Sequence, residues 1–379
     1  MTNLHNNYKD IFRALRLGFS IKKISMMMFG YIIAFIGYII CSYLTFLAQG
    51  WSIAEIWATY RLLPIPETLH WSGWLLWIIG IVFVVFTLLI TGTAVCKVTF
   101  EQLKGDDFFE IKKAFKFALQ NGRAVIMSPV MVILFILSIV IAGLILSLVG
   151  RIPYVGEIFT GLMILPAFAA SLFIVYLLII FIFTLFYTPA IIAATGNDTF
   201  DTLFEVFSML NDQTARLIWY SIILGFLSKV GFGLITFFST WAVKIGTSVL
   251  SVFMGGKLDD ILLNALSTFK LSIPYWCPEP FARLMDTVLC SIGGTIFFSP
   301  PSYQHINVAI LIATILFAIG YYLLIIFVVS YGTTVWFTGT LANYLVIVKK
   351  KDDRNLLETK EEPLTTVEEK PASTTQTSQ

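Results

Sequence analysis

The 379-residue sequence is 58% hydrophobic, and only 13% of its residues are charged. A soluble protein cannot cover that much apolar surface with so few polar residues, so the composition excludes a soluble globular chain and predicts a polytopic membrane protein. The net charge of +2 gives no sign of a nucleic-acid partner.

Six apolar runs are long enough to cross the roughly 30 Å hydrocarbon core of a bilayer as helices. They cover residues 25–47, 72–95, 124–149, 167–194, 217–240 and 306–330. The sixth stays apolar to residue 348, which is too long for one perpendicular crossing, so it must tilt, break or continue beyond the membrane. We expect the break at Tyr331-Gly332.

Lys and Arg residues gather at one end of these spans. They precede the first span, fill the connection between the second and third, and follow the sixth, whereas the opposite loops hold fewer. By the positive-inside rule we expect both termini to be cytoplasmic.

Residues 1–24 contain a basic amphipathic helix. At about 100° per residue, Ala14, Leu15 and Gly18 share one side. Arg13 and Arg16 lie on the other side. Such a helix is typical of an interfacial anchor, and it makes Arg13 and Arg16 candidate contacts to anionic lipids or to a partner.

A second amphipathic stretch joins the second and third spans. It opens as Gly105-Asp106-Asp107 and ends at Arg123. A carboxylate after a glycine is a good helix cap, because it accepts the free amide protons of the first turn. We therefore expect Asp106 or Asp107 to begin this helix.

A third amphipathic stretch joins the fourth and fifth spans. Asp198 is its expected N-cap. Apolar residues cover one side of it, and Asp201, Glu205 and Asp212 cover the other. These three carboxylates are candidate binding residues on the cytoplasmic side.

The pattern of amphipathic helix, outward span and return span occurs at residues 8–98, 106–195 and 198–348. The opening Gly-x-Asp-x-Phe-acidic occurs twice, and the run from Gly92 to Val95 resembles the run from Gly332 to Val335. We predict three parallel two-span repeats within a membrane domain of residues 25–348. The alternative is that any capped membrane hairpin has this pattern.

The largest outer segment covers residues 244–305 and includes an amphipathic stretch from Asp259. It also holds Cys277 and Cys290, which either form a disulfide, if that face is oxidising, or remain two free thiols. Residues 349–379 form a polar tail that cannot bury a core, and we expect it to be disordered.

Lys229 falls near the middle of the fifth span, within a glycine-rich run. A charge inside a membrane is costly, so such a lysine usually faces the bundle interior or a water cavity. It is either a contact for an anion or a proton on a transport pathway or a lysine that is paired or snorkelled for structural reasons.

The run from Tyr187 to Ser208 resembles poorly characterised families of bacterial polytopic membrane proteins, in which a span ending in proline precedes an acidic turn and an amphipathic helix. This resemblance implies a six-span inner-membrane protein and no activity. Mitochondrial carriers also contain three two-span units, but their Pro-x-acidic-x-x-basic motif is missing from the first, third and fifth spans.

The sequence contains no catalytic, metal-binding or cofactor-binding motif, so we predict a non-enzymatic protein without cofactors. The first hypothesis is a scaffold or subunit of a membrane complex, with protein partners docking on the amphipathic helices and lipids around the spans. The alternative is a transporter of a small solute or lipid that uses a polar site around Lys229.

Overall fold

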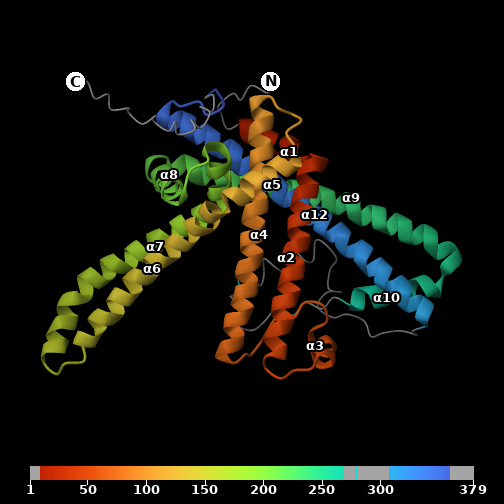
Figure 1. Cartoon of the computed structure of the whole chain (residues 1–379), viewed down its shortest axis with the longest axis horizontal. Helices are drawn as coiled ribbons and strands as arrows, with labels where there is room; N and C mark the ends of the chain where they lie inside the picture. Colours follow the sequence, from red (N-terminus) through yellow and green to blue (C-terminus); the bar gives the residue numbers. More distant parts are fainter. Residues whose placement is uncertain (1–8, 269–278, 280–306, 359–379) are drawn as a thin grey trace, which may run out of the picture.

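The computed structural model describes residues 9–268, 279 and 307–358, and every regular element in this part of the chain is a helix (Figure 1). Six helices are long and apolar enough to cross a membrane, which confirms a multi-pass, all-α membrane protein. They are α2 (Ile21–Leu47), α4 (Trp71–Lys104), α6 (Gly122–Val149), α7 (Val155–Thr195), α9 (Thr214–Met254) and α12 (Val308–Asp352).

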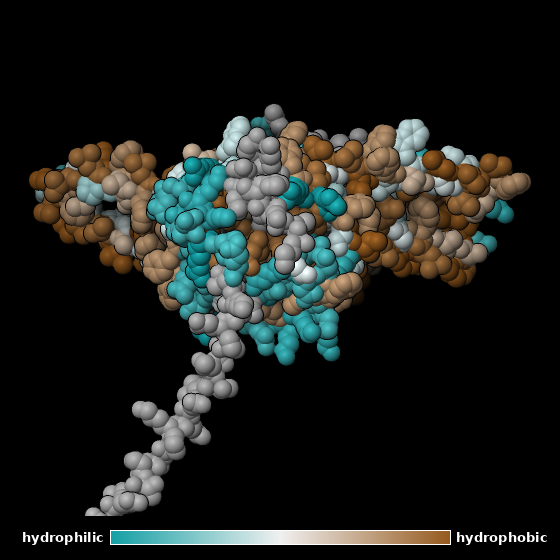
Figure 2. Space-filling model, turned by 90° about the horizontal axis from the view of Figure 1, so that it is seen from above, coloured by the Kyte–Doolittle hydropathy of each residue, from teal (hydrophilic) through white to brown (hydrophobic). Residues whose placement is uncertain are grey.

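The long helices form three antiparallel hairpins, α2 with α4, α6 with α7, and α9 with α12. The hairpins meet at one end of the molecule and diverge from there, as Figure 1 shows. Seen from that end, polar residues gather in the centre and the two outer hairpins are apolar (Figure 2). We call the meeting point the hub; it consists of residues 91–100 of α4, 187–193 of α7 and 330–348 of α12.

Small residues let the hub helices approach closely. A Cβ on Gly92 of α4 would lie 2.6 Å from the Phe337 ring of α12, and one on Gly339 of α12 would lie 2.0 Å from a methyl group of Leu224. Both glycines are buried, so the neighbouring side chain fills the space that a larger residue would take.

A chain of hydrogen bonds links three helices beside the hub. The Ser221 hydroxyl of α9 donates to the Leu217 carbonyl, with 2.7 Å between the oxygens. The Tyr187 hydroxyl of α7 therefore donates to Ser221 Oγ at 2.8 Å. Asn343 Nδ2 of α12 lies 3.5 Å from the Tyr187 hydroxyl. This directed chain satisfies polar groups that have no water to bond.

Three short helices cover the hub: α1 (Lys9–Gly18), α5 (Ile111–Gln120) and α8 (Thr199–Asp212). Each buries small or apolar residues on one side, such as Ala14 of α1, Ala114 of α5 and Val206 of α8. Helix α1 packs on α12 and α9 more than on the hairpin that it precedes. Its Gly18 lies against the backbone of Val335.

Two further short helices, α3 (Ile53–Tyr60) and α10 (Gly256–Ser267), lie away from the hub. Ser52 and Glu55 form a capping box at the start of α3, in which each side chain bonds the other residue's backbone N–H. The N–H of Ser52 holds the pKa of the Glu55 carboxyl below its usual value. This cap fixes the first turn of α3, which packs against α2.

Two local predictions differ from the structure. Helix α5 begins at Ile111 after Glu110, so the expected cap at Asp106 or Asp107 is wrong. Gly105 ends α4 at a φ of 110°, and the chain then needs a turn, in which Asp106 accepts a hydrogen bond from the Phe108 N–H at 3.0 Å.

Helix α12 runs unbroken from Val308 to Asp352, so the expected break at Tyr331-Gly332 is also wrong. The glycine serves close packing, because its carbonyl accepts a hydrogen bond from Ser228 and the Phe232 ring lies against it. In contrast, Asp198 caps α8 as predicted, by accepting a hydrogen bond from the Asp201 N–H at 3.3 Å.

We predict that Gly18→Leu separates α1 from α12. A Cβ at this position would lie 2.9 Å from the Val335 Cα, and backbone cannot move aside cheaply. The expected loss is about 1–3 kcal/mol of unfolding free energy, measured by denaturation in a mild detergent. Gly143→Ala is the control, since a Cβ there meets open space. An equal loss in both variants would contradict this packing.

Candidate functional site

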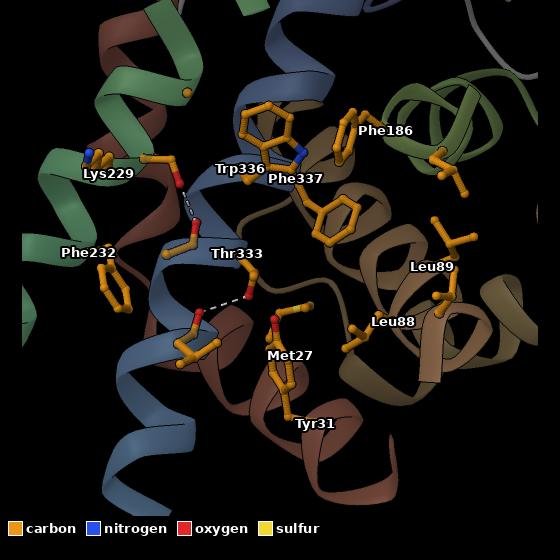
Figure 3. A pocket seen from close by; sticks show the side chains of 16 residues that line it. Met27, Tyr31, Leu88, Leu89, Phe186, Lys229, Phe232, Thr333, Trp336 and Phe337 are labelled. Carbon is orange, nitrogen blue, oxygen red and sulfur yellow. Dashed lines mark hydrogen bonds between the residues drawn. The ribbon is translucent and has the colours of Figure 1, made fainter. Parts of the chain in front are cut away.

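A hollow of about 560 Å³ lies next to the hub, between α2, α4, α7, α9 and α12. The long helices begin to diverge here, so their side chains no longer fill the space between them. Its walls are mostly apolar (Figure 3). The largest apolar contributors are Met27, Leu88, Leu89, Phe186, Phe232 and Phe337.

The hydroxyl groups on the walls bond mainly within the protein. Ser228 Oγ donates to the Gly332 carbonyl at 2.8 Å, and Thr333 Oγ1 donates to the Val329 carbonyl at 3.1 Å. The Tyr31 hydroxyl of α2 faces the Thr333 hydroxyl of α12 (Figure 3). These contacts join α9 and α2 to α12, so they shape the hollow and leave few hydroxyl protons for a ligand.

The indole N–H of Trp336 is different, because it is buried without any hydrogen-bond acceptor in the described part of the chain. Its ring packs edge-to-face on Phe186, with 5.0 Å between the ring centroids. A buried donor without an acceptor costs about 1–3 kcal/mol. The nitrogen itself is buried, so a ligand in the hollow reaches it only if neighbouring side chains move.

Lys229 lies in the first half of α9 and at one edge of the hollow (Figure 3). Its side chain is exposed, and no carboxylate among the described residues pairs with it. Two residues further on, Gly231 packs under Leu15 of α1. Residues two apart on a helix point about 200° apart, so Lys229 is level with α1 but points to another side of α9, and Figure 3 shows its nitrogen directed away from the other labelled side chains.

The other candidate residues do not line this hollow. Arg13 is half-buried and Arg16 is exposed, both on α1. On α8, Glu205 Oε1 lies 3.7 Å from Lys351 Nζ of α12, and Asp212 accepts a hydrogen bond from Ser208 at 2.8 Å. Asp201 is exposed. The structure therefore does not bring the acidic and basic candidates together at Lys229.

The cysteines of the outer segment, Cys277 and Cys290, lie outside the described residues, so the predicted disulfide stays a prediction. The same is true of most of the polar tail. Cys96 is a free, buried thiol whose sulfur donates to the Phe337 carbonyl at 3.3 Å. It is part of the hub, where it packs as a small buried residue.

Sequence reasoning missed Trp336. The available signal is its position: it follows Gly332 closely and lies well inside an apolar run, whereas membrane tryptophans usually mark the interface. A deeply placed indole must find an acceptor or remain unpaired, which makes such a residue a candidate for ligand contact.

No protein-family model, no curated protein and no solved structure matches this chain. The function must therefore be argued from the hollow and its chemistry.

We predict that Trp336→Phe leaves the ligand-free protein nearly as stable as the wild type, within about 1 kcal/mol. Removing a donor without an acceptor also removes its desolvation cost, which offsets the smaller ring. The matched control is Tyr187→Phe, which breaks bonds to Ser221 and Asn343 and should cost about 1–3 kcal/mol. Unfolding in detergent measures both.

The opposite order of stabilities would contradict this assignment. A large loss in Trp336→Phe would mean that the indole N–H has a partner in the ligand-free protein.

Proposed function

We propose that this multi-pass membrane protein binds a membrane lipid with an anionic head group, as part of lipid transport. The lipid's head lies at Lys229 and its chain enters the hollow. One observation carries the proposal: an apolar hollow has at its edge a lysine that no carboxylate among the described residues pairs with. A site of this kind favours a ligand that is charged at one end and apolar over the rest.

The position of Lys229 along α9, level with α1, supports binding of a lipid head group. Helix α1 carries Arg13 and Arg16 and packs over α9 at Gly231. If α1 lies at the cytoplasmic interface, as its basic residues favour, then Lys229 is level with the head groups of the inner leaflet. Both termini and the helices α5 and α8 are then cytoplasmic, in a bacterial inner membrane.

The three hairpins, with α1, α5 and α8 before their first long helices, support the proposed threefold repeat. Parallel two-span repeats that converge at one end leave a space between them, and transporter sites commonly lie between repeats. This arrangement is a further reason to prefer transport.

A role as scaffold or complex subunit is the second proposal. It is supported by the exposed Asp201 on α8, which is available to a partner. It has less support than lipid binding, because Glu205 on the same helix already meets Lys351 of α12. The acidic side of α8 therefore serves packing within the chain, at least in part.

We predict that Lys229→Gln weakens binding of phosphatidylglycerol about tenfold, because an ammonium–phosphate contact is worth about 1.5–3 kcal/mol. Binding of zwitterionic phosphatidylcholine should change little. The measurement is lipid titration of the detergent-purified protein, followed by native mass spectrometry.

Lys244→Gln is the matched control, since Lys244 is on the same helix, over the Trp241 ring, and does not line the hollow. It should bind phosphatidylglycerol like the wild type. Equal effects of the two substitutions, or no effect of Lys229→Gln, would refute a head-group site at Lys229.

A further inference from the structure

A second hollow of about 450 Å³ lies between α2 and α12, further from the hub. Its walls are formed by Phe35 and Ile36 of α2 and by Ile315, Ala318 and Ile319 of α12. Trp57 of α3 also lines it. We call this space the outer hollow and the space at Lys229 the inner hollow.

The two hollows adjoin along the same pair of helices. On α2, Tyr31 lines the inner hollow and the next residue, Ile32, lines the outer one. On α12, Val329 lines the inner hollow, and Ile326, about one helical turn away, lines the outer one. One side of α12 therefore faces both spaces, from Trp336 at the inner end to Ile315 at the outer end.

Polarity falls along this path. Lys229 lies at the edge of the inner hollow, and the indole of Trp336 forms part of its wall with its N–H buried. Around the outer hollow the hydroxyls of Thr268 and Tyr322 bond each other, so both are satisfied. The remaining walls there are almost wholly apolar. This gradient matches a molecule with one polar end.

A backbone hydrogen bond between two short segments forms part of the wall of the outer hollow. The Leu62 backbone N–H, after α3, donates to the Thr268 carbonyl at the end of α10, at 3.3 Å. Both residues line the outer hollow, together with Trp57. Leu62 and Thr268 are thus tied together at the wall of the outer hollow, beside Tyr322 of α12.

The distances suit an acyl chain. From Thr333 to Ile315, the outermost lining residue of α12, the rise is about 27 Å at about 1.5 Å per residue. That is most of the roughly 30 Å hydrocarbon thickness of a bilayer, so only a long apolar chain extends from the inner hollow well into the outer one. A short-chain anion would leave the outer hollow empty.

We infer that both hollows hold one ligand, a lipid whose anionic head lies at Lys229 and whose long acyl chain passes Tyr31 into the outer hollow. This inference rests on the proposed function and adds a requirement for chain length. Tyr31 lies at the boundary between the hollows, with its hydroxyl toward Thr333.

The test uses hexadecyl phosphate and decyl phosphate as probes, titrated into the detergent-purified full chain. Ala318→Phe and Ile319→Trp fill the outer hollow. Each should weaken hexadecyl phosphate about tenfold or more, because several methylenes lose their apolar contacts. Decyl phosphate should change by less than about twofold. Gly225→Leu fills the inner hollow and should weaken both probes.

Ala318 is buried whereas Ile319 is 52% exposed, so Ile319→Trp tests the idea even if Ala318→Phe fails to fold. Wild-type elution and thermal unfolding serve as the folding control. The inference is overturned if a folded outer-hollow variant binds hexadecyl phosphate like the wild type, or loses both probes equally. Failure of the wild type to bind either probe would instead refute the proposed function.

Discussion

Close packing of α4, α7 and α12 at the hub is the contact on which the other features depend. Lipid tails are as apolar as leucine, so membrane helices gain little from burying apolar surface and associate through close backbone approach and hydrogen bonds. Gly92 and Gly339 supply the close approach, and the chain from Asn343 through Tyr187 to Ser221 supplies the hydrogen bonds. Helices held at one end in this way are free to diverge at the other.

That divergence produces the two hollows. Beside the hub, α2 and α9 still reach α12 through Tyr31 and Ser228, but their side chains no longer meet across the whole gap. Since hydroxyl groups there bond the nearby backbone, the walls remain apolar although they contain polar residues. The Trp336 N–H is left without an acceptor and Lys229, at the edge of the inner hollow, without a carboxylate among the described residues.

Some local features were predictable from residue order. The run Asp198 to Asp201 contains both donor and acceptor of the α8 cap, so neighbours in sequence suffice. The same reasoning failed at Asp106, where the backbone of Gly105 turns the chain away first. The same reasoning failed at Gly332, because a glycine permits either a bend or close packing of another helix. The contacts with Phe232 and Ser228 show that close packing occurs here.

The sequence by itself determined that the chain has six long apolar helices, because crossing a membrane requires about 20 consecutive apolar residues whatever surrounds them. It also determined that Lys229 is an exceptional charge. It did not determine where the helices end, since α7, α9 and α12 run well beyond the predicted spans. Only the tertiary structure decided that Trp336 lies near Lys229 around one hollow, and that this hollow adjoins a second along α12. The physical reason is that unfilled space and unpaired donors depend on which helices diverge, and residues far apart in the chain control that divergence.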